Sequence, residues 1–263
     1  MKKIYALIIF TCPFIAFSSF PGCATQPVFS NIENSLSQDK LAYYNDSFDT
    51  FREDIWEKAA FTKGREQIAS YRHADVTIAE GQLSIKTKTG GFSQGGLGSK
   101  YVLRGEFDVQ LDCHIDFSKG KRDFDQYLFF FVALAETKTK EDRSVAHIGV
   151  VKKAGHGKGL IYSRHTVRGE RFPFSRGPRI GRFHGSFRIV RTGERMGMFF
   201  RKEREALWRE MGNFAFPADD VRLGFSLQNY IFERESIIAS SSLMATFDNF
   251  RINAAQEIIE EDI

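Results

Sequence analysis

Cysteine and histidine are both scarce in this sequence, and each scarcity excludes one kind of construction. The 263 residues contain three cysteines, of which Cys12 lies inside an N-terminal apolar segment. A disulfide framework is excluded, because a single Cys23–Cys113 bond would tie a flexible end to a buried strand. The six histidines show no two-His helical spacing. The sequence therefore argues against zinc, and we expect no cofactor.

Helical patterns are also few, and short alternating segments take their place. Only residues 50–61 and 203–211 could form short helices. In residues 106–117 polar and apolar residues alternate without a break, which places the apolar side chains on one face of a strand. The apolar members are Phe107, Val109, Leu111, Cys113, Ile115 and Phe117. Together with further strand signals at short spacing, this pattern predicts an all-β, two-sheet antiparallel sandwich.

Two other segments have expected places in this sandwich. Residues 127–135 form a continuous apolar run, which indicates a strand covered on both faces. The Gly-rich residues 90–98 lack the spacing of a phosphate loop and come before a strand. We therefore expect a flexible loop at the rim of the sandwich, where such loops often border a ligand.

The N-terminus has the features of an export signal. Lys2 and Lys3 precede the apolar residues 4–20, which are too short and too interrupted for a spanning helix. The tetrapeptide that ends at Cys23 resembles the bacterial lipobox, although Phe and Pro fill its first two positions. We expect a signal at residues 1–22 and a lipid on Cys23, which would anchor the protein in the bacterial envelope. An ordinary cleaved signal and secretion are the alternative.

The remaining chain divides into three parts. Residues 23–44 are polar and predict a tether. Residues 45–253 carry the strand signals and predict the domain. Residues 254–263 are acidic and predict a solvated tail.

Several pieces of the domain resemble the concanavalin A-like lectin and glucanase superfamily. In chain order they are Phe48, Trp56, residues 80–85, residues 103–109, residues 187–193, Trp208 and residues 247–252. The resemblance implies a jelly roll. It implies no single activity, because lectins, hydrolases, lyases and passive modules share this fold. Some members hold a structural calcium near the chain ends, where Asp248 and Asn249 could supply oxygen ligands.

The polar face of residues 106–117 is the first candidate for chemistry. Side chains two apart on a strand face lie about 7 Å apart, so their carboxyl groups can approach the roughly 5–5.5 Å that a retaining glycosidase needs. Glu106 and Asp108 match the first two acids of a glucanase strand motif, with Asp112 as a third partner. Gln110 stands where another acid belongs, and an amide cannot act as a general acid. The alternative is a solvated strand face.

A basic segment is the second candidate. Residues 152–195 hold twelve Lys and Arg against two Glu, with aromatic residues between them. Guanidinium groups and aromatic faces suit sulfated, carboxylated or phosphorylated polymers. The residues expected to bind are Arg164, Arg168, Arg171, Arg176, Arg179 and Arg182. The alternative is that folding scatters these arginines over several strands.

These features predict an exported, lipid-anchored and non-catalytic module that binds carbohydrate or another anionic envelope polymer. Two alternatives stay open. One is a glycoside hydrolase or lyase that uses the strand of Glu106 and Asp108, and the other is a structural domain that contacts an envelope protein. The expected partners are a polysaccharide or other polyanion and, through Cys23, a membrane. Export argues against nucleic acid.

Overall fold

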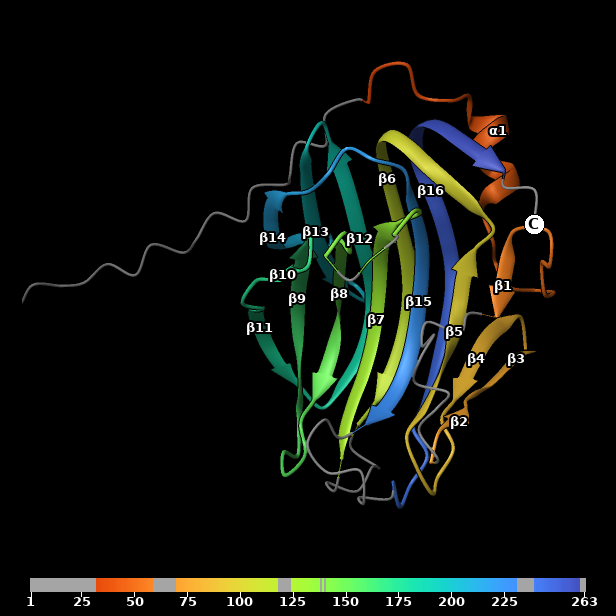
Figure 1. Cartoon of the computed structure of the whole chain (residues 1–263). Helices are drawn as coiled ribbons and strands as arrows, with labels where there is room; N and C mark the ends of the chain where they lie inside the picture. The colour runs from red at the N-terminus through yellow and green to blue at the C-terminus, as the bar shows by residue number, and fades with distance from the viewer. Residues whose placement is uncertain are drawn as a thin grey trace, which may run out of the picture.

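The computed structural model of the chain describes residues 32–58, 70–117, 124–137, 139, 141–230 and 239–260. Within them lie one short helix and sixteen strands (Figure 1). In chain order they are α1 (Gln38–Tyr44), β1 (Trp56–Lys58), β2 (Arg72–His73), β3 (Asp75–Ala79), β4 (Gln82–Lys86), β5 (Ser93–Ser99), β6 (Tyr101–Asp116), β7 (Asp125–Leu134), β8 (Val145–Lys152), β9 (Gly159–Val167), β10 (Glu170–Arg171), β11 (Ser175–Ile180), β12 (Arg182–Thr192), β13 (Arg195–Lys202), β14 (Arg209–Ala215), β15 (Val221–Tyr230) and β16 (Met244–Glu260). No helix in these ranges is long or apolar enough to cross a membrane. The expected signal and Cys23 lie outside the described residues.

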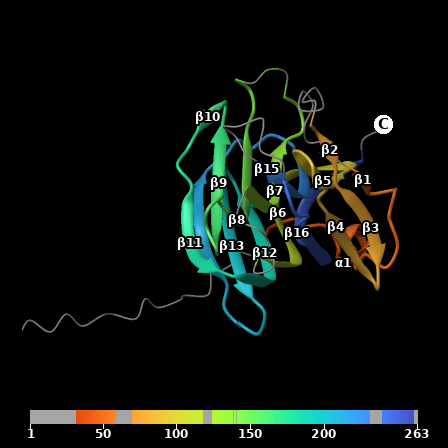
Figure 2. The same ribbon diagram turned by 90° about the horizontal axis from the view of Figure 1, so that it is seen from below.

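The strands form two layers that face each other (Figure 1, Figure 2). The layer that we call the β6 sheet contains β3, β4, β16, β6, β12, β13 and β14 in that order. The β7 sheet contains β5, β15, β7, β8 and β9, with β1 and β2 beside β5 and with β10 and β11 beside β9. Every strand pair among the described residues is antiparallel except β2 with β5. The predicted two-sheet antiparallel sandwich is therefore confirmed.

The core between the layers consists of the apolar halves of alternating strands. In β6 the apolar face is buried at each of Phe107, Val109, Leu111, Cys113 and Ile115. From the other layer, Leu128, Phe130 and Val132 of β7 join the same core cluster. Cys113 carries a free thiol, and burial raises the pKa of that thiol. Alternation thus predicted correctly which face of β6 is in the core.

Regular structure extends past residues 45 and 253, the bounds predicted for the domain. Helix α1 lies in the segment expected to be a tether, and its only buried side chain is Leu41. Strand β16 continues to Glu260 through most of the segment expected to be an acidic tail. Only Ala255 is buried in that last part of the strand. With a single buried residue in each of them, neither extension has a recognisable sequence pattern.

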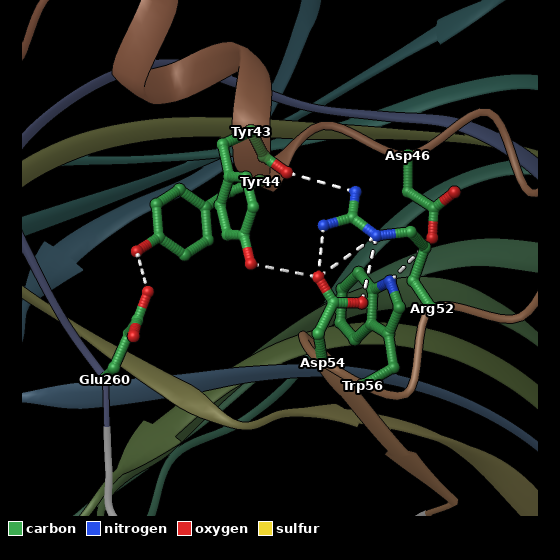
Figure 3. A network of polar contacts seen from close by, with 7 residues as sticks. All are labelled: Tyr43, Tyr44, Asp46, Arg52, Asp54, Trp56 and Glu260. Atoms are coloured by element: carbon green, nitrogen blue, oxygen red, sulfur yellow. Dashed lines mark hydrogen bonds and ion pairs between the residues drawn. The ribbon is translucent and has the colours of Figure 1, made fainter.

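A polar network joins α1, the segment before β1, and the end of β16 (Figure 3). Tyr44 donates a hydrogen bond to Glu260 across 2.9 Å, and burial together with this bond raises the pKa of Tyr44 to about 12. Tyr43 donates to Asp54, and the hydrogen bond from Arg52 lowers the pKa of Asp54 to about 2. The first and last described segments of the chain are therefore bound to each other.

Three local expectations are wrong. Residues 90–98 do not form a rim loop, since Ser93–Ser99 is strand β5, buried throughout and paired with β15. Glycine is needed there because a Cβ on Gly96 would lie 2.0 Å from the carbonyl oxygen of Phe225. Among the described residues, neither short helix forms. The described part of residues 50–61 contains β1, and residues 203–211 lead through turns into β14.

Candidate functional site

Acidic side chains on the polar face of β6 contact residues of the neighbouring strands. Asp108 is 5% exposed and makes a two-pronged ion pair with Arg188 of β12, whose Nε donates to Oδ1 across 2.7 Å. Asn253 of β16 donates to the same carboxylate oxygen across 3.1 Å. The guanidinium of Arg188 also lies 5.5 Å from the ring centroid of Trp208. Asp108 is therefore a buried carboxylate whose contacts are structural.

The other two candidate catalytic acids on this face, Glu106 and Asp112, also make hydrogen bonds. Glu106 accepts a hydrogen bond from the backbone N–H of Gly193 across 2.9 Å, and Asp112 accepts one from the hydroxyl of Ser186. The polar side chains of this face contact side chains of β12 and β16, so water alone does not cover the face. Among the described residues, no contact favours catalysis by Glu106, Asp108 and Asp112, and their catalytic role stays a prediction.

Asp248 and Asn249, the candidate calcium ligands, lie on β16. Asp248 faces Asp112 in the strand register, and its Oδ1 accepts the N–H of Asn249 across 2.7 Å. Among the described residues, no group of three or more His, Cys, Asp or Glu side chains is placed to hold a metal ion. The calcium site stays a prediction.

The six arginines of the basic segment fall on two sheets. Strand register places Arg164, Arg171, Arg176 and Arg179 on the outer face of the β7 sheet, which is the face away from the core. Arg168 lies in the turn between β9 and β10. Arg182 lies opposite Asp116 on the β6 sheet. Folding therefore keeps four of the six predicted residues together and separates two.

Aromatic side chains share this outer face with the four arginines. Tyr127, Phe129 and Phe131 follow one another along the outer side of β7, and each begins a row of paired residues that crosses the sheet to an arginine. The rows are Phe131–His147–Arg164, Phe129–Gly149–Tyr162–Arg176 and Tyr127–Val151–Leu160–Arg179.

Ring contacts connect these rows. The ring centroid of His147 lies 5.6 Å from that of Phe129 and 5.4 Å from that of Tyr162. Tyr162 lies 6.3 Å from Phe174, over which the guanidinium of Arg176 lies at 4.9 Å. Tyr127, Phe129, His147 and Phe174 are partly exposed, while Phe131 and Tyr162 are almost covered. These rings form one connected aromatic surface.

The electrostatics of this face are positive. Burial lowers the pKa of His147 to about 3, and Arg164, Arg143 and His165 lower it further, so its imidazole is neutral at pH 7. At one end of the face, Lys153 donates to Asp125 across 2.6 Å and contacts the hydroxyl of Tyr127. The arginines therefore provide the positive charge, and His147 adds none.

The expectation that residues 127–135 are covered on both faces is wrong for the outer face, where Tyr127 and Phe129 are partly exposed. The run is apolar without a break, which indicates a strand covered on both faces. Its aromatic and aliphatic members nevertheless alternate: Tyr127, Phe129 and Phe131 point outward, whereas Leu128, Phe130 and Val132 point into the core. Aromatic residues at every second position would have identified β7 as the strand with a half-exposed ring face.

We expect folding stability to fall between pH 7.5 and pH 5, with His147 responsible for part of the loss. An unfolded histidine protonates near pH 6.5, whereas folded His147 does so near 3. Between these values only the unfolded state binds the proton. The stabilisation is therefore complete above about pH 6.5 and is lost as the pH falls. In thermal unfolding, His147→Gln should reduce the loss between pH 7.5 and 5 by about 1–2 kcal/mol.

Two other histidines also make the folding stability depend on pH in this range. Burial also lowers the pKa values of His114 and His165, so the His147→Gln protein should keep part of the pH dependence. A slope identical to that of the wild type would contradict the role given to His147.

Comparisons with known proteins identify the architecture. No family model and no curated protein matches the sequence. Among solved structures, LamAcat from Zobellia galactanivorans matches with a TM-score of 0.53 at 9% identity, over 80% of this chain and 96% of that one. A pseudo β-1,3-glucanase of Mycobacterium tuberculosis, described as an immunostimulatory antigen, matches with a TM-score of 0.56 at 11% identity, over 83% and 98%.

A third structure comes from work on the endo-acting O-glycanases that members of the human gut microbiota express. It matches with a TM-score of 0.54 at 11% identity, over 83% of this chain and 99% of that one. At such low identity these likenesses show the fold and leave the activity open.

Proposed function

Because the chain is a concanavalin A-like jelly roll, we propose that it is a non-catalytic binding module for carbohydrate or another anionic envelope polymer. The observation that carries the proposal is the outer face of the β7 sheet, where partly exposed aromatic rings lie beside arginines. Binding sites for organic ligands are typically lined by aromatic side chains with a few placed polar groups. On the β6 sheet, by contrast, Arg188 and Arg201 lie over the ring of Trp208, which is only 9% exposed. Arg188 is already paired with Asp108.

Two further observations support binding rather than hydrolysis. On the described strands of the β7 sheet, the carboxylates of the outer face are Asp125 and Glu57, one at an end and one at an edge. Asp125 pairs with Lys153, and Glu57 lies 3.8 Å from Arg222. A retaining glycosidase needs two carboxyl groups about 5–5.5 Å apart. Each of these ion pairs contains a single carboxyl group. One neighbour in fold is itself described as a pseudo glucanase.

We expect Phe129→Ala to weaken polysaccharide binding about tenfold or more, because truncating a central aromatic contact typically costs at least about 1.4 kcal/mol. Affinity electrophoresis of the full chain in gels that contain a panel of polysaccharides at low salt would measure this loss. Met244→Ala is the matched control, since Met244 is 56% exposed on the β6 sheet. Failure of the wild type to bind any polymer at low salt would overturn the proposed function.

The proposal includes export and a lipid on Cys23, on the basis of the N-terminal sequence alone. Metabolic labelling of growing cells with a fatty acid should mark the wild type and should leave Cys23→Ala unlabelled. Equal labelling of both proteins would remove the anchor from the proposal and would leave the binding face untouched.

A further inference from the structure

Two parallel lines of side chains run along the outer face of the β7 sheet. The ring line consists of Tyr127, Phe129 and Phe131 on β7. The arginine line consists of Arg171 on β10, Arg164 on β9, and Arg176 and Arg179 on β11. Successive rows are about 7 Å apart along the strands, and the two lines are about 10–14 Å apart across them, given the usual strand spacing.

Strand β8 forms the floor between the two lines. Its outward residues in the three rows are His147, Gly149 and Val151, of which Gly149 has no side chain and Val151 is buried. His147 is neutral at pH 7. No carboxylate lies on the outer side of β8 or β9. A negatively charged ligand above this floor would meet no repulsion from it.

The arginine line differs from four other arginines of the chain, which are paired with carboxylates. Arg52, Arg104, Arg188 and Arg209 pair with Asp54, Asp220, Asp108 and Glu205. Within the described part of the chain, none of the four arginines in the line makes an ion pair or a side-chain hydrogen bond, and the contact of Arg176 is with the ring of Phe174. Arg171, Arg176 and Arg179 are exposed. Their positive charge is therefore not neutralised by a described carboxylate.

We infer that this face selects an acidic polysaccharide, bound with its chain along the strands between the ring line and the arginine line. Each sugar turns an apolar face or edge to the partly exposed rings of the ring line, Tyr127 and Phe129, and its carboxylate or sulfate to the arginines. Guanidinium groups bind such anions with two parallel hydrogen bonds. The inference rests on the proposed function, because it names the class of polymer that the same face binds.

The test compares one polymer backbone with and without its charge. Affinity electrophoresis in polygalacturonate and in fully methyl-esterified polygalacturonate separates charge from sugar identity, and heparin distinguishes sulfate from carboxylate. We expect the wild type to bind polygalacturonate or heparin at least about tenfold more tightly than the methyl ester, a difference of about 1.4 kcal/mol. Raising the salt concentration should reduce this preference.

Variants locate the effect on the arginine line. Arg164→Ala and Arg176→Ala should each reduce the affinity for the charged polymer several-fold and change binding of the methyl ester little. Arg176→Lys keeps the charge but loses the two-pronged geometry, and it should fall between Arg176→Ala and the wild type. The control is Arg209→Ala, an exposed arginine on β14 of the other sheet. Circular dichroism confirms that each variant is folded.

The possible failures separate the two proposals. Equal binding of both galacturonan forms, abolished by Phe129→Ala, would overturn the selection of acidic polymers and leave the binding face in place. Absence of binding to all three polymers would overturn both. Tighter binding of single-stranded DNA than of any polysaccharide would also overturn the inference, because the ligand class would then be wrong.

Discussion

Arg188→Ala is expected to lower the free energy of unfolding by about 3–5 kcal/mol, because it leaves the buried carboxylate of Asp108 without its charge partner. Both side chains are almost covered, that of Asp108 at 8% and that of Arg188 at 11% exposure. Asn253 would be the remaining donor to that carboxylate, and one amide does not replace a guanidinium. Urea unfolding followed by circular dichroism would measure the loss.

A double variant tests whether the unpaired charge is the cause. Arg188→Ala combined with Asp108→Ala should recover part of the stability that Arg188→Ala loses, since no buried anion then remains. Arg195→Ala, an exposed arginine of β13, should stay within about 0.5 kcal/mol of the wild type. A loss below about 1 kcal/mol for Arg188→Ala would contradict a structural role of the pair.

The same region also tests the alternative that the β6 strand is catalytic. If the wild type cleaved a polysaccharide, and a folded Glu106→Gln protein did not, then Glu106 would be more than a partner for the backbone of Gly193. We expect no such cleavage, because the contacts of Glu106, Asp108 and Asp112 are all made within the sheet.

Gly149→Ala is expected to destabilise the protein by about 3 kcal/mol, at the upper end of the cost of inserting a methyl group into a packed site. A Cβ on Gly149 would lie 2.0 Å from the carbonyl oxygen of Leu128 and 2.7 Å from the Cα of Phe129. Strands β7 and β8 would have to separate at the centre of the proposed binding face. Thermal unfolding and the polygalacturonate gel together would show both losses.

Gly181→Ala is the matched control for this substitution. A Cβ on Gly181 meets nothing within 4 Å, so its stability should change by no more than about 0.5 kcal/mol. If both alanine variants were equally stable, β7 and β8 would be adjustable at Gly149, and the geometry proposed for the floor of the site would be wrong.

The alternation in β6 shows what a sequence can and cannot establish about a face. A period of two assigned Phe107, Val109 and Leu111 to the core, because alternation is a local property of one strand. It could not reveal that Arg188, eighty residues later, would pair with Asp108. Which partner covers a polar face depends on strand order and register, and these are set by contacts far apart in the sequence.

The arginines of the basic segment also show that a local sequence pattern does not establish strand order. Arg164, Arg171, Arg176 and Arg179 stay together because β9 turns back directly into β10 and β11, so that a local segment becomes a local surface. Arg182 follows Gly181 onto β12 and joins the other sheet. A cluster in sequence therefore stays a cluster in space only as far as the hairpin extends.

The bond between the two ends of the described chain determines where mechanical load enters the protein. The N–H of Leu36 donates to the carbonyl of Ala255 across 2.8 Å, and Tyr44 holds Glu260. A tensile force applied through the N-terminal segment would therefore reach β16 first and would be shared by shear with β6, its partner along most of its length. The rings and arginines lie on the opposite sheet, so a tethered protein could bear tension without distorting the face that we propose for binding.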